Sequence, residues 1–106
     1  NLTYLNLAAN QITDVLPLTE LTNLIALYLS GNQITNIKPL SNLTNSELSL
    51  YLNNNQITDI KPLSKLYNLT FLDLNDNPIK NIKPLERLEE FDVEIDYDSD
   101  QDSDDY

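Results

Sequence analysis

An eight-residue pattern, L-x-L-x-x-N-x-I, occurs four times along this chain of 106 residues. The copies begin at Leu5, Leu27, Leu50 and Leu72, so they are separated by 22, 23 and 22 residues. A regular period of this length indicates a solenoid, in which each repeat forms one coil and buries its apolar face against the neighbouring coils. This repeat constrains the fold more than any other feature of the sequence.

The hydrophobic period changes from two to three within each repeat. The L-x-L alternation predicts a short strand, because alternate side chains of a strand lie on the same face. Apolar residues then recur at every third position, which suits 3₁₀-like turns. These series, which we expect to point into one continuous core, run over residues 12–24, 34–43, 57–69 and 79–91, and the last one ends at Phe91. The pattern predicts an α/β-type repeat solenoid, with a parallel β-sheet on the concave face and 3₁₀-like or irregular turns on the convex face.

One asparagine follows each strand at the point where the chain must turn. Its amide can donate to and accept from backbone groups of adjacent coils that would otherwise be buried without partners. We therefore assign a structural role to an asparagine ladder formed by Asn10, Asn32, Asn55 and Asn77.

Residues 21–40 carry the element L-T-N-L-x-x-L-x-L-x-x-N-Q-I-T-[DN]-I-x-P-L. This element resembles the internalin-type leucine-rich repeats of bacterial surface proteins, and the resemblance covers about residues 1–91. It implies a leucine-rich-repeat arc and a secreted or cell-surface location, with a cytoplasmic location left open. The chain starts inside a repeat, so we expect it to be a fragment of a longer chain.

Three regions are expected along the chain. Residues 1–91 form about four leucine-rich repeats, with a one-residue insertion near residues 45–47 that we expect to bulge so that Glu47 avoids burial. Residues 92–97 alternate apolar and acidic side chains, which is typical of a terminal edge strand. Residues 86–90 are expected to form a short helical or turn segment, and residues 98–106 an acidic, disordered tail.

The composition argues against several functions. The chain contains no His and no Cys, so imidazole and thiolate chemistry are absent, and no pair of carboxylates is placed for catalysis; we predict no enzyme, no cofactor and no metal site. The net charge is −11, which argues against a nucleic-acid partner, and no apolar run is long enough for membrane insertion.

The side chains between the core leucines of each strand are expected to face the concave side. They form an uncharged, partly aromatic patch around Tyr28 and Tyr51, in which tyrosine offers a large contact area at a low cost in rotamer entropy. An alternative is that these two rings only stack on adjacent strands and stabilise the sheet. The candidate binding residues are Tyr4, Tyr28, Tyr51, Asn53, Phe71, Asp73 and Asn75.

These observations favour a protein–protein interaction module that recognises a protein or peptide on its concave face. The alternative is a structural spacer or capping segment of a longer leucine-rich-repeat protein, with no partner of its own. For the acidic tail, a solubilising role competes with weak calcium binding and with docking onto a basic partner; the tail lacks the glycine and distal glutamate of an EF-hand loop. Lys38, Lys61 and Lys83 align on the convex side, where we interpret them as a solvated row.

Overall fold

The computed structural model describes residues 2–44, 47–91 and 93–98. It contains one five-stranded parallel sheet whose strands are hydrogen-bonded in chain order. The strands are β1 (Tyr4–Asn6), β2 (Ala26–Tyr28), β3 (Leu48–Tyr51), β4 (Leu69–Asp73) and β5 (Glu94–Asp96). The predicted leucine-rich-repeat solenoid is therefore confirmed.

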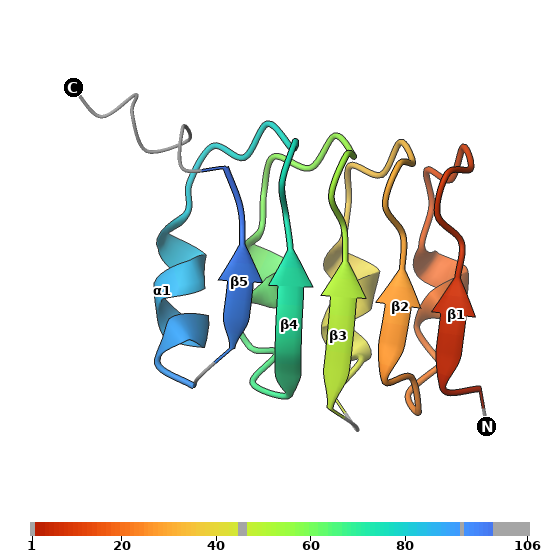
Figure 1. Ribbon diagram of the computed structural model, residues 1–106, viewed down its shortest axis with the longest axis horizontal. Coiled ribbons are helices and arrows are strands. Elements are labelled where there is room, and N and C mark those ends of the chain that lie inside the picture. The colour runs from red at the N-terminus through yellow and green to blue at the C-terminus, as the bar shows by residue number, and fades with distance from the viewer. Residues whose placement is uncertain (1, 45–46, 92, 99–106) are drawn as a thin grey trace.

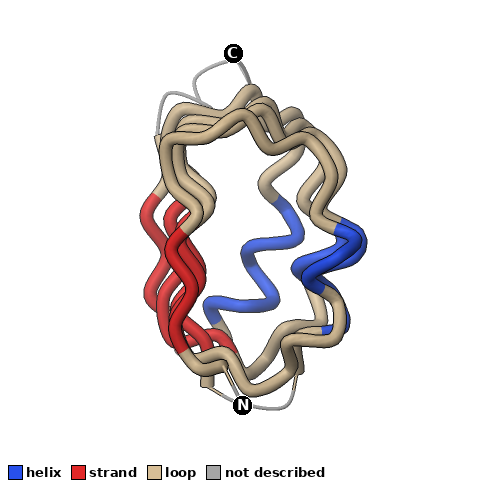
Figure 2. Tube along the Cα trace, turned by 90° about the vertical axis from the view of Figure 1, so that its right-hand side faces the viewer, coloured by secondary structure: helices blue, strands red, loops and turns tan. Residues whose placement is uncertain are grey.

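A helical segment returns the chain from the end of one strand to the start of the next. Three of these segments are 3₁₀ helices, η1 (Leu16–Leu18), η2 (Lys38–Asn42) and η3 (Lys61–Leu63), and the last is an α-helix, α1 (Lys83–Glu89). The sheet lies on one side of the molecule and the helical segments lie on the other (Figure 1). Seen along the stack, successive coils superimpose closely (Figure 2), so equivalent residues of successive repeats lie side by side.

The core lies between the sheet and the helical segments. The first leucine of the repeat is fully buried in the three inner strands, as Leu27, Leu50 and Leu72. Aliphatic side chains of the 3₁₀ helices, such as Leu40 and Leu63, meet them from the opposite side. Burial of this continuous aliphatic column is the main favourable contribution to the stability of a coil that cannot fold alone.

A left-handed backbone conformation occurs at the same position of every repeat, directly before the ladder asparagine. The φ angles are 60° at Ala9, 71° at Gly31, 63° at Asn54 and 61° at Asp76. Only glycine adopts this conformation without steric cost, and asparagine and aspartate tolerate it better than alanine. The single glycine of the chain therefore stands where the turn requires a positive φ.

The pairing of β3 with β4 is irregular at Thr70 of β4, and the extra residue of the third repeat lies before Leu48. The pairing of β3 with β4 shifts between Leu48 and Ser49, so that Leu48 lies opposite Leu69 while Ser49 lies opposite Phe71. Leu48 is 1% exposed, and Glu47 is exposed to solvent. The other two residues of the expected bulge, 45 and 46, lie outside the described residues, as does the acidic tail beyond residue 98.

The expectation that Phe91 belongs to the core is wrong. Its side chain is 51% exposed and packs against the exposed ring of Tyr67, with ring centroids 4.5 Å apart. Phe91 lies beyond α1, which ends at Glu89, so the helical spacing that buries Leu85 and Leu88 does not extend to it. Leu88 is the last buried residue of this segment, and Val93 fills the core before β5.

Candidate functional site

Three ladder asparagines fix the turns that follow β2, β3 and β4. Asn55 is representative: its Nδ2 donates to the carbonyls of Leu29 and Leu52, both at 3.0 Å, and its Oδ1 accepts from the N–H of Ile34 at 3.0 Å. Asn32 and Asn77 are also buried and make equivalent bonds to the preceding coil. These side chains join adjacent coils and are turned away from solvent.

Asn10 differs from the other three asparagines. It is exposed, and its Nδ2 donates within its own turn, to the carbonyls of Leu7 and Ala8. Among the described residues no coil lies on its outer side, and its Nδ2 bonds stay within its own turn.

The register of the sheet arranges the outward side chains in rows across the strands. In the central row, Tyr28 lies beside Tyr51, and Tyr51 lies beside Asp73. In the row below it, Ala26 lies beside Ser49, and Ser49 beside Phe71. Asn53 and Asn75 follow the ends of β3 and β4 and border the central row.

Three rings of these rows form a continuous cluster, which we call the aromatic strip: Tyr28, Tyr51 and Phe71. The first two stack with centroids 4.5 Å apart and an interplanar angle of 15°, and Phe71 tilts against Tyr51 at 5.1 Å. Each ring is half-buried, so part of its surface remains accessible. Stacking and accessibility therefore occur together in the same side chains.

Tyr4 stands apart from the aromatic strip. It lies on β1 opposite Ala26, which is only 5% exposed, and its own side chain is 62% exposed. The small alanine separates Tyr4 from the rings of the inner strands in its row. Six of the seven candidate binding residues therefore lie on β2, β3 or β4 or directly after these strands, and Tyr4 lies at the edge of the sheet.

The concave face is not uncharged, because β5 adds acidic side chains to it. Glu94 lies beside Phe71, and Asp96 lies beside Asp73. The spacing of 23 residues that separates Leu27 from Leu50 also separates these pairs, so this register could have been read from the sequence. We call Asp73, Glu94 and Asp96 the acidic border; it adjoins the aromatic strip directly.

The surroundings of Tyr51 raise the pKa of its phenol. The largest cause is burial, and the neighbouring Tyr28, Asp73 and Glu94 add unfavourable interactions with a phenolate. The neutral phenol is therefore favoured, and it keeps both a donor and an acceptor available on the concave face.

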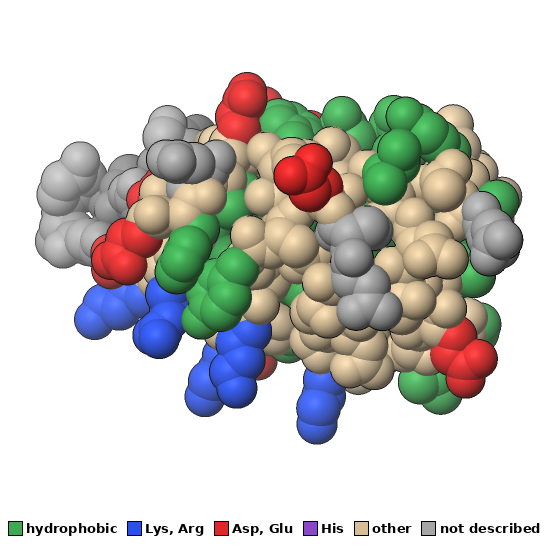
Figure 3. Space-filling model, turned by 90° about the horizontal axis from the view of Figure 1, so that it is seen from below, with side chains coloured by type: hydrophobic (Ala, Val, Ile, Leu, Met, Phe, Trp, Pro, Cys, Tyr) green, Lys and Arg blue, Asp and Glu red, His purple; other side chains and the backbone are tan. Residues whose placement is uncertain are grey.

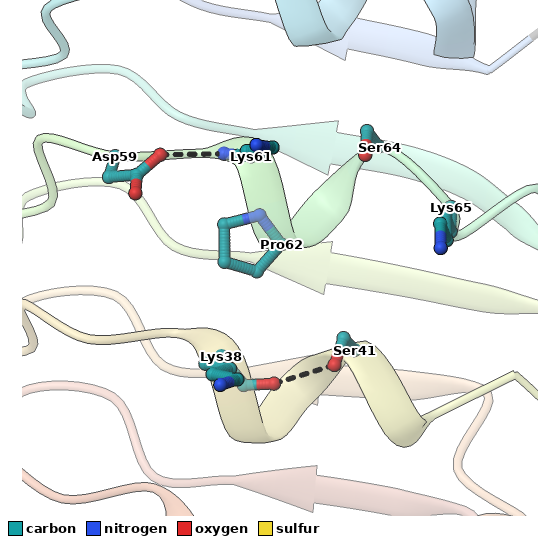
Figure 4. A pocket seen from close by; sticks show the side chains of 7 residues that line it. All are labelled: Lys38, Ser41, Asp59, Lys61, Pro62, Ser64 and Lys65. Carbon is teal, nitrogen blue, oxygen red and sulfur yellow. Dashed lines mark hydrogen bonds between the residues drawn. The ribbon is translucent and has the colours of Figure 1, made fainter.

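Most of the cations lie on the helical side of the molecule. Five of the six cations line shallow recesses between successive return segments: Lys38, Lys61, Lys65, Lys83 and Arg87. Lysine and arginine side chains gather along the lower edge of Figure 3, which is the helical side. Figure 4 shows one recess of about 400 Å³ between η2 and η3. Within it, Oδ1 of Asp59 accepts from the N–H of Lys61 at 3.0 Å, and the Ser41 hydroxyl donates to the carbonyl of Lys38 at 2.7 Å.

Neither a metal-binding group nor a membrane-spanning helix is found within the described parts of the chain. No three acidic side chains among residues 2–44, 47–91 and 93–98 converge in a way that could hold a metal ion. No helix in the same residues is long and apolar enough to cross a membrane.

A parallel sheet backed by 3₁₀ turns, with a buried asparagine closing each inner turn, defines a leucine-rich-repeat protein. The family model for leucine-rich repeats in two copies matches residues 1–45 and 48–92. The chain belongs to this family, and its repeats are of the internalin type. The comparison with curated proteins returned no match.

Solved bacterial structures are similar to this chain. An internalin (inlF) from Listeria monocytogenes is 44% identical over 82% of this chain and 25% of its own, with a TM-score of 0.76. An internalin C2 (inlC2) from the same species is 42% identical over 92% of this chain and 45% of its own, with a TM-score of 0.78. A leucine-rich-repeat protein from Leptospira interrogans is 36% identical over 89% of this chain and 31% of its own, with a TM-score of 0.53. The chain thus spans less than half the length of each of these proteins.

Proposed function

We propose that this chain is a protein-interaction module that recognises a protein or peptide on its concave face. The observation that supports the proposal best is the aromatic strip, in which the stacked rings of Tyr28 and Tyr51 continue into Phe71. Aromatic side chains bury large areas on binding, and rings that are already held by their neighbours lose little conformational entropy when a partner docks. The position of the strip on a sheet, rather than on loops, keeps its geometry fixed.

The family membership supports the same function, because leucine-rich-repeat arcs offer an extended concave surface to partners. We also infer a secreted or cell-surface location, which rests on the likeness to internalins alone.

The test compares two aromatic pairs of the same chain. A Tyr28→Ser/Tyr51→Ser variant removes the stacked pair of the concave face, and a Tyr67→Ser/Phe91→Ser variant removes the exposed pair that lies after η3 and α1. The two variants and the wild-type chain serve as baits for extract and cell-surface proteins of the source organism. Urea unfolding and far-UV circular dichroism first establish that each variant is folded.

We expect a captured partner to be lost with the concave variant and retained with the Tyr67/Phe91 variant. Loss with the second variant alone would place recognition away from the concave face. If no bait captures a partner, the proposal fails in favour of the alternative, a structural spacer within a longer array of repeats.

A further inference from the structure

The aromatic strip ends at three carboxylates, those of Asp73, Glu94 and Asp96. Tyr51 is followed across the sheet by Asp73 and Asp96, and Phe71 is followed by Glu94. Adjacent strands lie about 4.8 Å apart, so the three side chains share one small area of the surface. Five of the six cations line recesses on the helical side.

This acidic border is unfavourable for the isolated chain. Like charges directly opposite each other on neighbouring strands destabilise a sheet, and Asp73 and Asp96 are such a pair. The Oδ1 atom of Asp73 is partly compensated, because it accepts bonds from the N–H and the Nδ2 of Asn75, both at 3.0 Å. Asp73 and Glu94, after burial and Tyr28, also contribute to the raised pKa of the Tyr51 phenol. A cation bound here would relieve the repulsion.

The position of Phe71 indicates what kind of cation fits. One side of its ring contacts Tyr51, and its other neighbour across the sheet is Glu94 of β5. A guanidinium or ammonium group between this ring and the carboxylates would gain a cation–π contact and one or more charge-assisted hydrogen bonds. The uncharged rings of Tyr28 and Tyr51 next to it would accept an apolar side chain of the same ligand.

We propose that the concave face selects a polypeptide segment that places a lysine or arginine at the acidic border and an apolar residue on the aromatic strip. This inference rests on the proposed function and adds the chemical class of the partner to it. Charge supports this choice, because five of the six cations lie on the helical side and the acidic border attracts a basic segment to the β4–β5 end of the concave face.

A random library of displayed 12-residue peptides tests the proposal without assuming a partner. Peptides selected on the wild-type chain are measured against three variants. One neutralises the acidic border (Asp73→Asn/Glu94→Gln/Asp96→Asn), and a matched control removes the same charge from the helical side (Asp59→Asn/Glu86→Gln/Glu90→Gln). The third variant is Tyr28→Ser/Tyr51→Ser, which removes the stacked pair. Asparagine keeps the Oδ1 acceptor that Asp73 and Asp59 supply to backbone N–H groups.

We expect the selected peptides to be enriched in lysine and arginine and to bind the border variant about 10-fold more weakly, while the control variant stays within about two-fold. Added salt should weaken binding to wild type and control but not to the border variant. Peptides that need Tyr28 and Tyr51 but carry no excess of basic residues would overturn this inference and leave the proposed function intact. If no selected peptide depends on the tyrosines, both fail.

Discussion

The backbone N–H of Asp76 donates a 2.7 Å hydrogen bond to Oδ2 of Asp98. In the three preceding repeats the equivalent N–H donates to a backbone carbonyl of the next coil, from Ala9 to Ser30, from Gly31 to Asn53 and from Asn54 to Asn75. At the last turn a side chain thus replaces the carbonyl. Asp98, which the sequence assigns to the start of the acidic tail, closes the ladder of the sheet.

The first prediction concerns this closing bond. Asp98→Ala should lower the free energy of unfolding by about 0.5–1 kcal/mol, because the Asp76 N–H is exposed enough for water to replace part of the bond. Asp98→Asn retains an acceptor and should lose less. Urea unfolding measures the stability, and amide exchange at Asp76 locates the effect. Unchanged exchange at Asp76 in the alanine variant would contradict this role.

The asparagine ladder should show a gradient of stability effects along the chain. Asn55→Ala leaves buried groups of Leu29, Leu52 and Ile34 without partners and should lower the free energy of unfolding by about 2–4 kcal/mol. Asn10→Ala should cost about 1 kcal/mol or less, because its bonds are exposed. Equal losses in the two variants, measured by denaturant unfolding, would show that the links between coils are not what stabilises the turn.

The left-handed turn position predicts effects of opposite sign in neighbouring repeats. Ala9→Gly should raise the free energy of unfolding by about 0.5–1 kcal/mol, since alanine carries steric cost at a φ of 60°. Gly31→Ala should lower it by about 1 kcal/mol, because the new Cβ would also approach the backbone of Ala9 to 3.4 Å. Thermal unfolding of the pair measures both, and a stabilising Gly31→Ala would rule out this account.

Phe91 and Leu88 should respond very differently to truncation. Leu88→Ala removes a fully buried side chain and should cost about 2–5 kcal/mol, whereas Phe91→Ala should cost about 1 kcal/mol or less, because its ring is half-exposed and contacts Tyr67. The two variants are compared in one series of urea titrations. If Phe91→Ala lowered the free energy of unfolding as much as Leu88→Ala does, Phe91 would have to be counted as a core residue.

Alkaline pH should destabilise the folded chain through Tyr51. Its pKa is raised in the folded state, so above the ordinary tyrosine value of about 10 the unfolded phenol loses its proton before the folded one does. The contribution is fully present below that pH and is lost as the pH rises through the folded value. A ¹³Cζ NMR titration resolves the individual tyrosines, and Tyr51→Phe should reduce the slope of stability with pH. Titration of Tyr51 together with an unfolded tyrosine peptide would contradict the prediction.

The solenoid was predictable because its signal is repeated. Each L-x-L pair fixes one strand, and four copies at nearly constant spacing fix the order of the strands and the faces of Leu27, Leu50 and Leu72. The outward rows followed from the same count, and so did the proximity of Tyr28 to Tyr51.

The errors lie where the repeat changes. Phe91 continues a three-residue period in the sequence, but α1 ends at Glu89, and the periodicity alone does not show where the helix ends. The predicted patch, which is uncharged with Asp73 at its edge, does not include Glu94 and Asp96, because β5 lacks the L-x-L pattern from which the rows were built. The hydrogen bond between Asp98 and the N–H of Asp76 depends on the position of one side chain, which no pattern of residue types predicts.

The extra residue of the third repeat lies before Leu48 and leaves the register of the following residues of β3 unchanged. Leu50 still lies beside Leu72, and Tyr51 beside Asp73. A slip of one residue carried through β3 would have exchanged the two faces of the strand, turning Tyr51 inward and Leu50 outward. Because the difference in length lies before the strand, repeats of unequal length can be combined in one array without altering the surface that the strands present.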